Sequence, residues 1–237
     1  AADPTGDPAF DALGLLLTEV AIPRAVIDDI VAGFELDAAD WRPRSEADLL
    51  RYCYHVAGAV GVAMALVMGV DPADETTLDR ASDLGIAFQL ANIARDIAED
   101  AAADRCYLPV DWLVELDIPP GQHMHPAFRP RLAVMAKWLA EMAGEYEASA
   151  RWGARKLPPR SRWAVLAAAG IYGDIARAVR RRGDHAWDHR TATTRAAKFG
   201  WVARAGWSVL RRPPLRRIAR DGLWTRPRFA GDAEAAQ

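Results

Sequence analysis

The sequence holds little cysteine, no apolar run of bilayer length and no stretch of alternating polar and apolar residues. Two cysteines in 237 residues cannot build a disulfide framework, so we expect a reducing, cytosolic compartment. The longest uncharged apolar stretch, residues 56–70, has 15 residues, whereas a membrane-spanning helix needs about 20. We therefore predict a buried helix there. Residues 1–7 hold neither a basic segment nor an apolar core, so we expect no signal peptide.

Apolar residues instead recur with helical spacing along nearly the whole chain. Start and stop signals predict helices over residues 10–20, 23–34, 46–68, 74–100, 111–116, 130–157, 161–182 and 194–210. Ser45 followed by Asp48 resembles an N-cap with an acidic first turn. We predict one all-α domain of packed helices over residues 1–212. An Arg- and Pro-rich, flexible tail is expected over residues 213–237.

The formal net charge of −2 hides a strong asymmetry along the chain. Residues 1–150 hold 26 Asp and Glu against 10 Lys and Arg, whereas residues 151–237 hold 6 against 20. Such a basic part can bind nucleic acid, an anionic membrane surface or an acidic ligand, or pair with the acidic part of its own chain. No recognised nucleic-acid-binding motif accompanies the arginines. We therefore expect no nucleic-acid partner, and self-pairing and membrane contact through residues 177–220 stay open.

One polar stripe stands out on the predicted helix 74–100. Gln89, Asn92, Asp96 and Asp100 fall within roughly 80° of one another. A solvated helix face is the alternative, but such a face usually carries Lys, Glu and Arg. The Asp96 and Asp100 spacing places two carboxylates about 6 Å apart at Cβ, where they repel unless a cation lies between them. Oxygen ligands suit Mg²⁺, whose shell substrate phosphate completes, so the stripe predicts a magnesium–diphosphate site.

Two segments resemble signatures of the squalene/phytoene synthase family. Residues 83–108, which include QLANIARDIAED and then RCYL, are similar to the second aspartate-rich region of that family. The segment YCYHVAGAVG at residues 52–61 resembles another of its signatures. Cys106 before Tyr107 is closer to phytoene synthases than to squalene synthases. The resemblance, over residues 3–204, implies an all-α isoprenoid-synthase-type helical bundle with a central cavity.

The resemblance also implies an activity. Phytoene synthases condense two geranylgeranyl diphosphates head to head to phytoene through a cyclopropyl (prephytoene) diphosphate, in carotenoid biosynthesis. The reaction needs Mg²⁺, with Mn²⁺ as an alternative, and no NADPH. Two other functions stay open: squalene synthase-type condensation of farnesyl diphosphate, and an inactive helical scaffold of the same family. A prenyl diphosphate is then the substrate, and other carotenoid enzymes are candidate partners. The expected location is the cytoplasm, with peripheral contact at the inner face of the membrane.

The roles of individual residues follow from their positions in the motifs. The resemblance implies catalytic roles for Tyr52, Arg95, Arg105 and Tyr107, substrate binding by Gln89, Asn92, Tyr172 and Arg190, and metal ligation by Asp96, Asp100 and Asn92. For Arg95 the alternative is a surface ion pair. For Tyr52 it is a buried aromatic ring with a satisfied hydroxyl. The small residues after Tyr52 allow either close helix packing or a slot for an isoprenoid tail: Ala57, Gly58, Ala59, Gly61, Ala63 and Ala65.

The sequence departs from the family pattern in one respect. The first aspartate-rich motif has no counterpart, because Gly33 stands where Asp28-Asp29 would need a further acid. We expect that roughly the first quarter of the family sequence is absent, and with it half of the Mg²⁺ ligands and one cavity wall. His123 and His125 have a metal-binding spacing, but they lie in a Pro-rich loop without Cys or acidic companions and are interpreted as adventitious.

Overall fold

The computed structural model describes residues 5–211 and 218–229, and all regular structure within them is helical. In chain order the α-helices are α1 (Pro8–Glu19), α2 (Arg24–Ala38), α3 (Glu46–Cys53), α4 (Ala59–Val67), α5 (Glu75–Ala102), α6 (Val110–Glu115), α7 (Arg129–Gly153), α8 (Pro159–Arg182) and α9 (Arg195–Arg211). Shorter elements are the π-helix η1 (Tyr54–Gly58) and the 3-10 helices η2 (Pro126–Phe128), η3 (Ala154–Lys156) and η4 (Gly183–His185). The predicted all-α class is confirmed.

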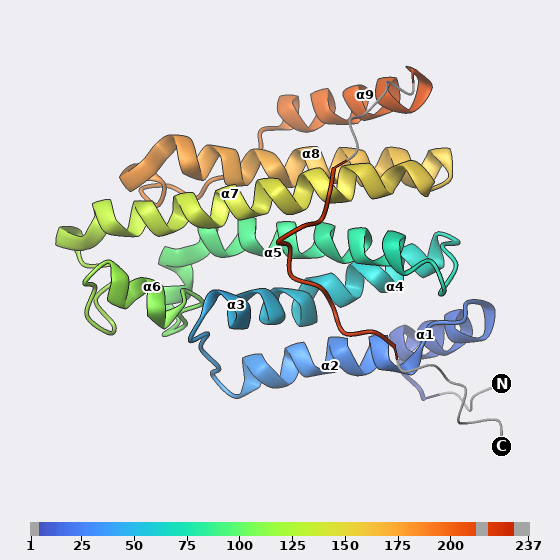
Figure 1. Cartoon of the computed structure of the whole chain (residues 1–237), viewed down its shortest axis with the longest axis horizontal. Helices are drawn as coiled ribbons and strands as arrows, with labels where there is room; N and C mark the ends of the chain where they lie inside the picture. Colours follow the sequence, from blue (N-terminus) through green and yellow to red (C-terminus); the bar gives the residue numbers. More distant parts are fainter. Residues whose placement is uncertain (1–4, 212–217, 230–237) are drawn as a thin grey trace.

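Helix α5 runs through the middle of the molecule (Figure 1). Helices α2, α3 and α4 lie on one side of it, and α7, α8 and α9 follow in succession on the other. The main core forms around α5, where Leu90, Leu132 and Leu139 are fully buried. Residues of α5 therefore have neighbours on several sides, and its polar stripe lies inside the fold.

Side-chain caps fix where the helices begin. At α3 the predicted cap is a complete capping box: the Asp48 N–H donates to Ser45 Oγ at 3.2 Å, and the Ser45 N–H donates to the Asp48 carboxylate at 3.2 Å. At α5 the Asp74 carboxylate accepts hydrogen bonds from the backbone N–H and the hydroxyl of Thr77. These contacts satisfy amide donors that a helix start leaves unpaired.

Glycines let α4 and η1 approach the α5 backbone closely. A Cβ atom on Gly85 would lie 2.1 Å from the carbonyl oxygen of Ala57, and one on Gly61 would lie 2.4 Å from that of Ala81. No other residue type fits at either position without a shift of backbone. Close packing is therefore one use of the small residues that follow Tyr52.

The stretch Glu46–Val67, across α3, η1 and α4, is long and apolar enough to cross a membrane by length and composition alone. Half of its most apolar window is buried inside the fold, and Leu49, Cys53 and Val62 are fully buried. The stretch is thus a core element, as predicted for the buried helix over residues 56–70.

Residues 218–229 cross the molecule as an extended segment (Figure 1) and pair with acids on α5. Arg220 donates two hydrogen bonds to the buried carboxylate of Asp83, at 2.8 and 2.7 Å. The buried Arg226 lies 3.2 Å from Asp79. The acids recur every fourth residue on one face of α5, and a buried carboxylate is unfavourable unless a cation pairs with it.

This packing differs from the flexible tail that we expected over residues 213–237. Residues 218–229 are held by ion pairs, while residues 212–217 and 230–237 lie outside the described residues. Arg220 and Arg226 therefore pair with acids of their own chain, which is one of the alternatives left open for the basic part of the sequence.

Candidate active site

The predicted polar stripe lies on α5 in a half-buried position. Gln89, Asn92, Asp96 and Asp100 are all of intermediate exposure. The side-chain Oδ1 of Asn92 is buried and has no hydrogen-bond partner. A buried polar atom without a partner costs about 1–3 kcal/mol. The stripe is therefore not an ordinary solvated helix face. The unpaired Asn92 oxygen is free to bind a ligand.

Two arginines meet the carboxylate of Asp96. The Arg95 Nε donates to Asp96 Oδ1 at 2.6 Å, and a second guanidinium nitrogen donates to Oδ2. Arg190, from the segment between η4 and α9, lies 3.5 Å from the same carboxylate. Arg95 does form an ion pair, but its side chain is only 16% exposed, and the hydrogen bond with Asp96 raises its pKa. Arg190 also lies 4.0 Å from Glu99, so a cation that binds the carboxylates would free the two guanidinium groups for an anionic ligand.

Asp100 lies one helical turn beyond Asp96, in a less polar environment. Burial, aided by the charge of Asp96, raises the pKa of Asp100 to about 6, and Arg105 opposes that rise. The Arg105 backbone N–H donates to the Asp100 carbonyl at 2.8 Å, whereas the Arg105 side chain is exposed. A divalent cation bound between Asp96 and Asp100 would reduce the repulsion between their carboxylates.

Tyr52 and Tyr107 form a pair that the sequence did not predict. Their rings stack with centroids 5.0 Å apart. Both hydroxyls donate to Oδ1 of Asp37, at 2.8 Å from Tyr52 and 3.2 Å from Tyr107. Burial and these contacts raise the pKa of Tyr52, so its hydroxyl stays protonated. Tyr107 also lines a small cavity with Asp100 and Arg105, which connects the tyrosine pair to the α5 stripe.

Asp37 is the residue that sequence reasoning missed in this group. It lies in the last turn of α2, where a carboxylate faces the negative end of the helix dipole. An acidic residue at that electrostatically unfavourable position was the one sequence feature that could have indicated a functional role for Asp37.

Tyr172 comes to α5 from α8. Its ring stacks on Phe88 with centroids 4.1 Å apart, and its phenol group lies near enough to Arg95 to interact with it electrostatically. The structure thus brings Tyr172, Arg95, Asp96 and Arg190 to one region.

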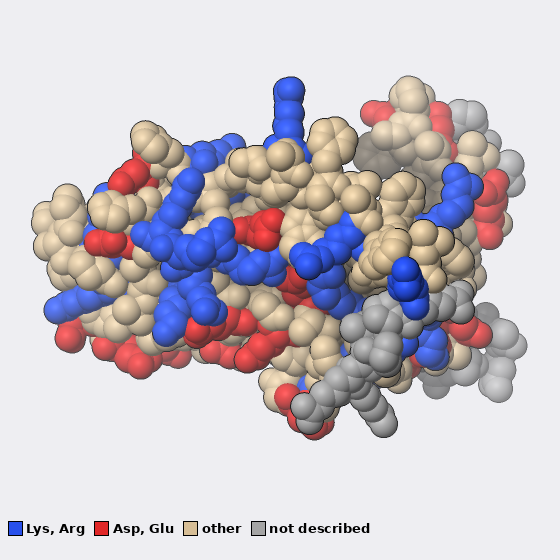
Figure 2. Space-filling model, turned by 90° about the horizontal axis from the view of Figure 1, so that it is seen from above, with Lys and Arg blue, Asp and Glu red and all other residues tan. Residues whose placement is uncertain are grey.

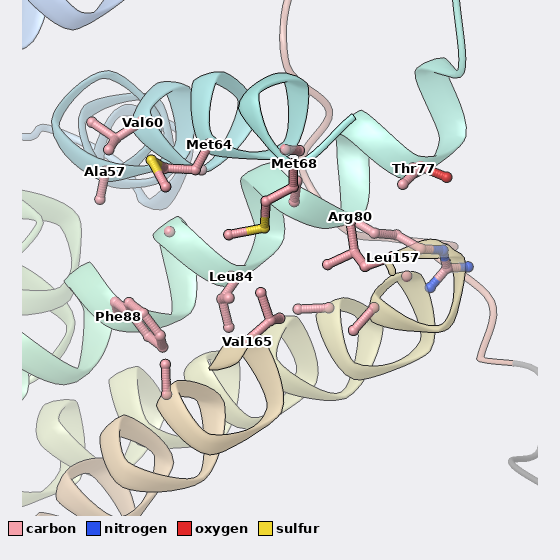
Figure 3. A pocket seen from close by; sticks show the side chains of 18 of the residues that line it. Ala57, Val60, Met64, Met68, Thr77, Arg80, Leu84, Phe88, Leu157 and Val165 are labelled. Atoms are coloured by element: carbon pink, nitrogen blue, oxygen red, sulfur yellow. The ribbon is translucent and has the colours of Figure 1, made fainter. Parts of the chain in front are cut away.

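An apolar cavity of about 400 Å³ lies between α4, α5 and α8 (Figure 3). Figure 3 shows Phe88 toward one end and Thr77, Arg80 and Leu157 toward the other; along α5, Thr77 and Phe88 are separated by about 16 Å. Its walls are mainly aliphatic, with Val60, Met64, Met68, Leu84 and Val165 among the lining residues.

The cavity and the polar stripe share a face of α5. Asn92 follows Phe88 by one turn, and Asp96 follows Asn92 by another. Ala57, Gly61 and Ala65 also line the cavity, so the small residues after Tyr52 serve both close packing and an apolar slot.

The other polar candidates have local partners. The Nδ1 of His125 accepts a hydrogen bond from the backbone N–H of Ala127 at 3.2 Å, and His123 is buried. The Asp29 carboxylate accepts a 2.5 Å hydrogen bond from Tyr54 and lies 3.5 Å from His55. Within residues 5–211 and 218–229, no group of three or more His, Cys, Asp and Glu is placed to hold a metal ion.

An all-helical fold whose central helix carries an apolar cavity and, in the following turns, carboxylates, an amide and arginines defines a protein class. It suits a ligand that has a long apolar tail and an anionic head. The squalene/phytoene synthase sequence model matches residues 1–198. The chain belongs to the squalene/phytoene synthase family, which is a family of prenyltransferases.

Individual relatives agree with this assignment. A phytoene synthase of Pseudescherichia vulneris is 45% identical over 223 residues, which are 93% of this chain and 71% of the relative. A 15-cis-phytoene synthase of a Paracoccus species is 45% identical over 224 residues, 94% of this chain and 72% of the relative. The crystal structure of a dehydrosqualene synthase in complex with a ligand matches with a TM-score of 0.78 at 26% identity, over 89% of this chain and 73% of that one. These similarities confirm the family that the two sequence signatures indicated.

Proposed function

We propose that the chain condenses two molecules of geranylgeranyl diphosphate head to head into phytoene, through a cyclopropyl diphosphate. One observation carries this proposal: the apolar cavity and the cluster of Asn92, Asp96 and Arg95 lie on the same face of α5. The cavity suits a prenyl tail, and the cluster suits its diphosphate. Relatives at 45% identity bear the name phytoene synthase, which supports this choice of substrate.

Two parts of the site have different roles in the reaction: the polar cluster binds the diphosphate, and the apolar cavity binds the prenyl tail. Ionisation breaks the allylic C–O bond and leaves the electron pair on a diphosphate oxygen. Arg95 and Arg190 would bind that oxygen's charge as it develops. The aliphatic walls around Leu84 and Val165 offer no nucleophile and exclude water, which protects the carbocation. We assign Tyr172 and Gln89 to positioning of the substrate between the two ends.

Magnesium fits the residues on α5 by its donor chemistry. The Asp96 and Asp100 carboxylates and the orphaned Asn92 oxygen would hold the ion, with Mn²⁺ as an alternative. When bound, it would act as a Lewis acid toward the departing diphosphate. The proposed condensation contains no reduction, so it requires no NADPH. Tyr52, Tyr107 and Arg105, which border the Asp100 side of the stripe, would position the leaving group.

A second substrate deserves a test. The similarity to a dehydrosqualene synthase structure at a TM-score of 0.78 favours farnesyl diphosphate as the competing choice. The two substrates differ in tail length, and the cavity between Phe88 and Leu157 must accommodate that tail.

Product identification separates these functions. The purified chain is incubated with Mg²⁺ and either prenyl diphosphate, and the extracted lipid is identified by mass spectrometry. We expect phytoene from geranylgeranyl diphosphate. A farnesyl-derived product alone would identify the alternative condensation, and no product together with no Mg²⁺-dependent binding of either substrate would favour the inactive scaffold.

We further propose a cytoplasmic protein that contacts the inner face of the membrane and hands its product to other carotenoid enzymes. The support is chemical: a product without its diphosphates has only apolar surface and partitions into lipid or into a partner's cavity.

A further inference from the structure

The outward face of α9 exposes a stripe of large apolar side chains. Phe199, Trp207 and Leu210 are 75%, 59% and 81% exposed. With helical spacing they fall within roughly 80° of one another, and the exposed Ala203 lies among them. Isolated exposed apolar residues are ordinary, but a continuous stripe on one helix marks an interaction surface.

The orientation of this stripe is fixed by the opposite face of α9. The indole nitrogen of Trp201 donates to Asp174 on α8 at 2.5 Å, and that of Trp163 on α8 donates to the Val202 carbonyl at 2.8 Å. Ala205 is buried against α8. Rotation of α9 to bury the stripe would break these contacts. The packing of α9 on α8 therefore keeps the stripe on the surface.

Cations flank the stripe on both sides. Arg195 lies along one edge, and Arg204 and Arg211 lie along the other, while the exposed Lys198 lies nearer the direction of Ala205. The helix contains no Asp or Glu. None of these four cations takes part in an ion pair within residues 5–211 and 218–229.

Several other arginines of the basic part differ in this respect. Arg177 pairs with Glu147, and Arg220 pairs with Asp83. Of the membrane-contact range 177–220 that the sequence suggested, α9 is thus a helix in which every cation lacks an acidic partner among the described residues. Figure 2, which looks onto the side of α8 and α9, shows basic side chains set in uncharged surface over these helices.

We propose that the outward face of α9 docks on the surface of an anionic lipid bilayer. An apolar stripe with an aromatic residue and with cations at both edges is the pattern of a helix that lies in the membrane interface. Trp has a preference for that depth. The helix has 17 residues and four charges, too few and too polar to span the bilayer.

Charge distinguishes this partner from others. A second copy of the chain would place like charges opposite one another, and nucleic acid would leave the stripe of Phe199, Trp207 and Leu210 without an apolar partner. The inference rests on this surface alone. Its failure would therefore leave the proposed reaction untouched, and failure of the reaction would leave the docking surface in place.

Vesicle sedimentation tests the proposal with the whole chain. Sucrose-loaded vesicles are made of phosphatidylcholine alone or of phosphatidylcholine with phosphatidylglycerol. We expect the chain to sediment with the anionic vesicles, and less of it as salt rises. F199S/W207S/L210S should lower the partition coefficient at least tenfold. R195E/K198E should lower it by more than tenfold, because each basic residue near an anionic surface contributes about fivefold.

The control replaces apolar residues that are equally exposed elsewhere. Phe10 and Leu15 on α1 are 63% and 68% exposed, and F10S/L15S should bind vesicles as the unmodified chain does. Circular dichroism melts check that all variants fold. Equal binding to neutral and anionic vesicles, no binding to either, or equal losses in the α9 and α1 variants would overturn the proposal. Light scattering that shows a dimer, abolished by F199S/W207S/L210S, would instead identify a contact between copies.

Discussion

The guanidinium of Arg190 lies 3.5 Å from the carboxylate of Asp96. The segment after α8 thus returns to α5 two turns beyond Phe88, where Arg95 contacts the same carboxylate. Arg190 also lies 4.0 Å from Glu99, so the two arginines are paired with carboxylates, and a cation bound by those carboxylates would free both guanidinium groups for an anion. This relationship joins elements that are far apart in sequence into one anion site, and it underlies the proposed binding of diphosphate.

Replacement of Asn92 should separate stability from activity. Its buried Oδ1 has no partner, so Asn92→Leu removes an unsatisfied polar group that costs about 1–3 kcal/mol. We expect a higher melting temperature and a loss of Mg²⁺-dependent turnover. Thermal melts and product assays on the same preparation check both. An active Asn92→Leu enzyme would remove Asn92 from the site.

Tail length should depend on the end of the cavity away from Phe88. Leu157 lines that end, and Leu157→Trp would shorten the space. We expect the ratio of kcat/KM for geranylgeranyl diphosphate to that for farnesyl diphosphate to fall by at least about 10–200-fold, the range for a single methylene in an apolar pocket. Leu15→Trp on the surface of α1 is the matched control. An unchanged ratio would show that the tail lies elsewhere.

Close packing of α5 can be tested at Gly85. A Cβ there would lie 2.1 Å from the Ala57 carbonyl oxygen, so Gly85→Ala should cost about 1–3 kcal/mol. Gly144 in α7 has no atom within 4 Å of a Cβ, and Gly144→Ala should stabilise by about 0.5–1 kcal/mol because alanine favours helix. Denaturant unfolding measures both. Equal effects of the two substitutions would refute the close approach.

Stability should fall at mildly acid pH because of His123. Burial, with the charge of Arg42, lowers the pKa of His123 below its usual 6.5. The unfolded chain then binds the proton more readily than the folded one. The stability that this difference contributes is present above about pH 6.5 and is lost as pH falls below it. The free energy of unfolding should decline less between about pH 7 and pH 5 in His123→Gln. An identical decline would assign the pH dependence to other groups.

Much of the fold was predictable because its signals are local. Ser45 and Asp48 mark the start of α3, and the periodic apolar residues of α5 mark both a core helix and its polar stripe. The contacts between distant segments left no such signal. Asp37 accepts hydrogen bonds from two tyrosine hydroxyls, and Arg220 forms an ion pair with Asp83. Neither contact can be deduced from sequence spacing, because each depends on how distant segments pack.

The same distinction applies to the candidate site. Asp96 and Asp100 share a helix, so their proximity follows from sequence. Arg190 reaches them only through the turn after α8, and the family resemblance, not the spacing, indicated it. The extended segment 218–229 was expected to be a flexible tail because its Arg- and Pro-rich composition hides the acids of α5 with which it pairs.

The most direct test of the account is the turnover of geranylgeranyl diphosphate by Asp96→Asn. The substitution keeps the size of the side chain but removes the charge that contacts Arg95 and Arg190. We predict a fall in kcat of about 10²–10³-fold, the usual effect of losing one electrostatic contact in a transition state, with the fold retained in circular dichroism and a lower melting temperature because Arg95 and Arg190 lose their partner. Asp111→Asn, on the exposed face of α6, should retain full activity. Wild-type turnover by Asp96→Asn would contradict the placement of the reaction on this face of α5.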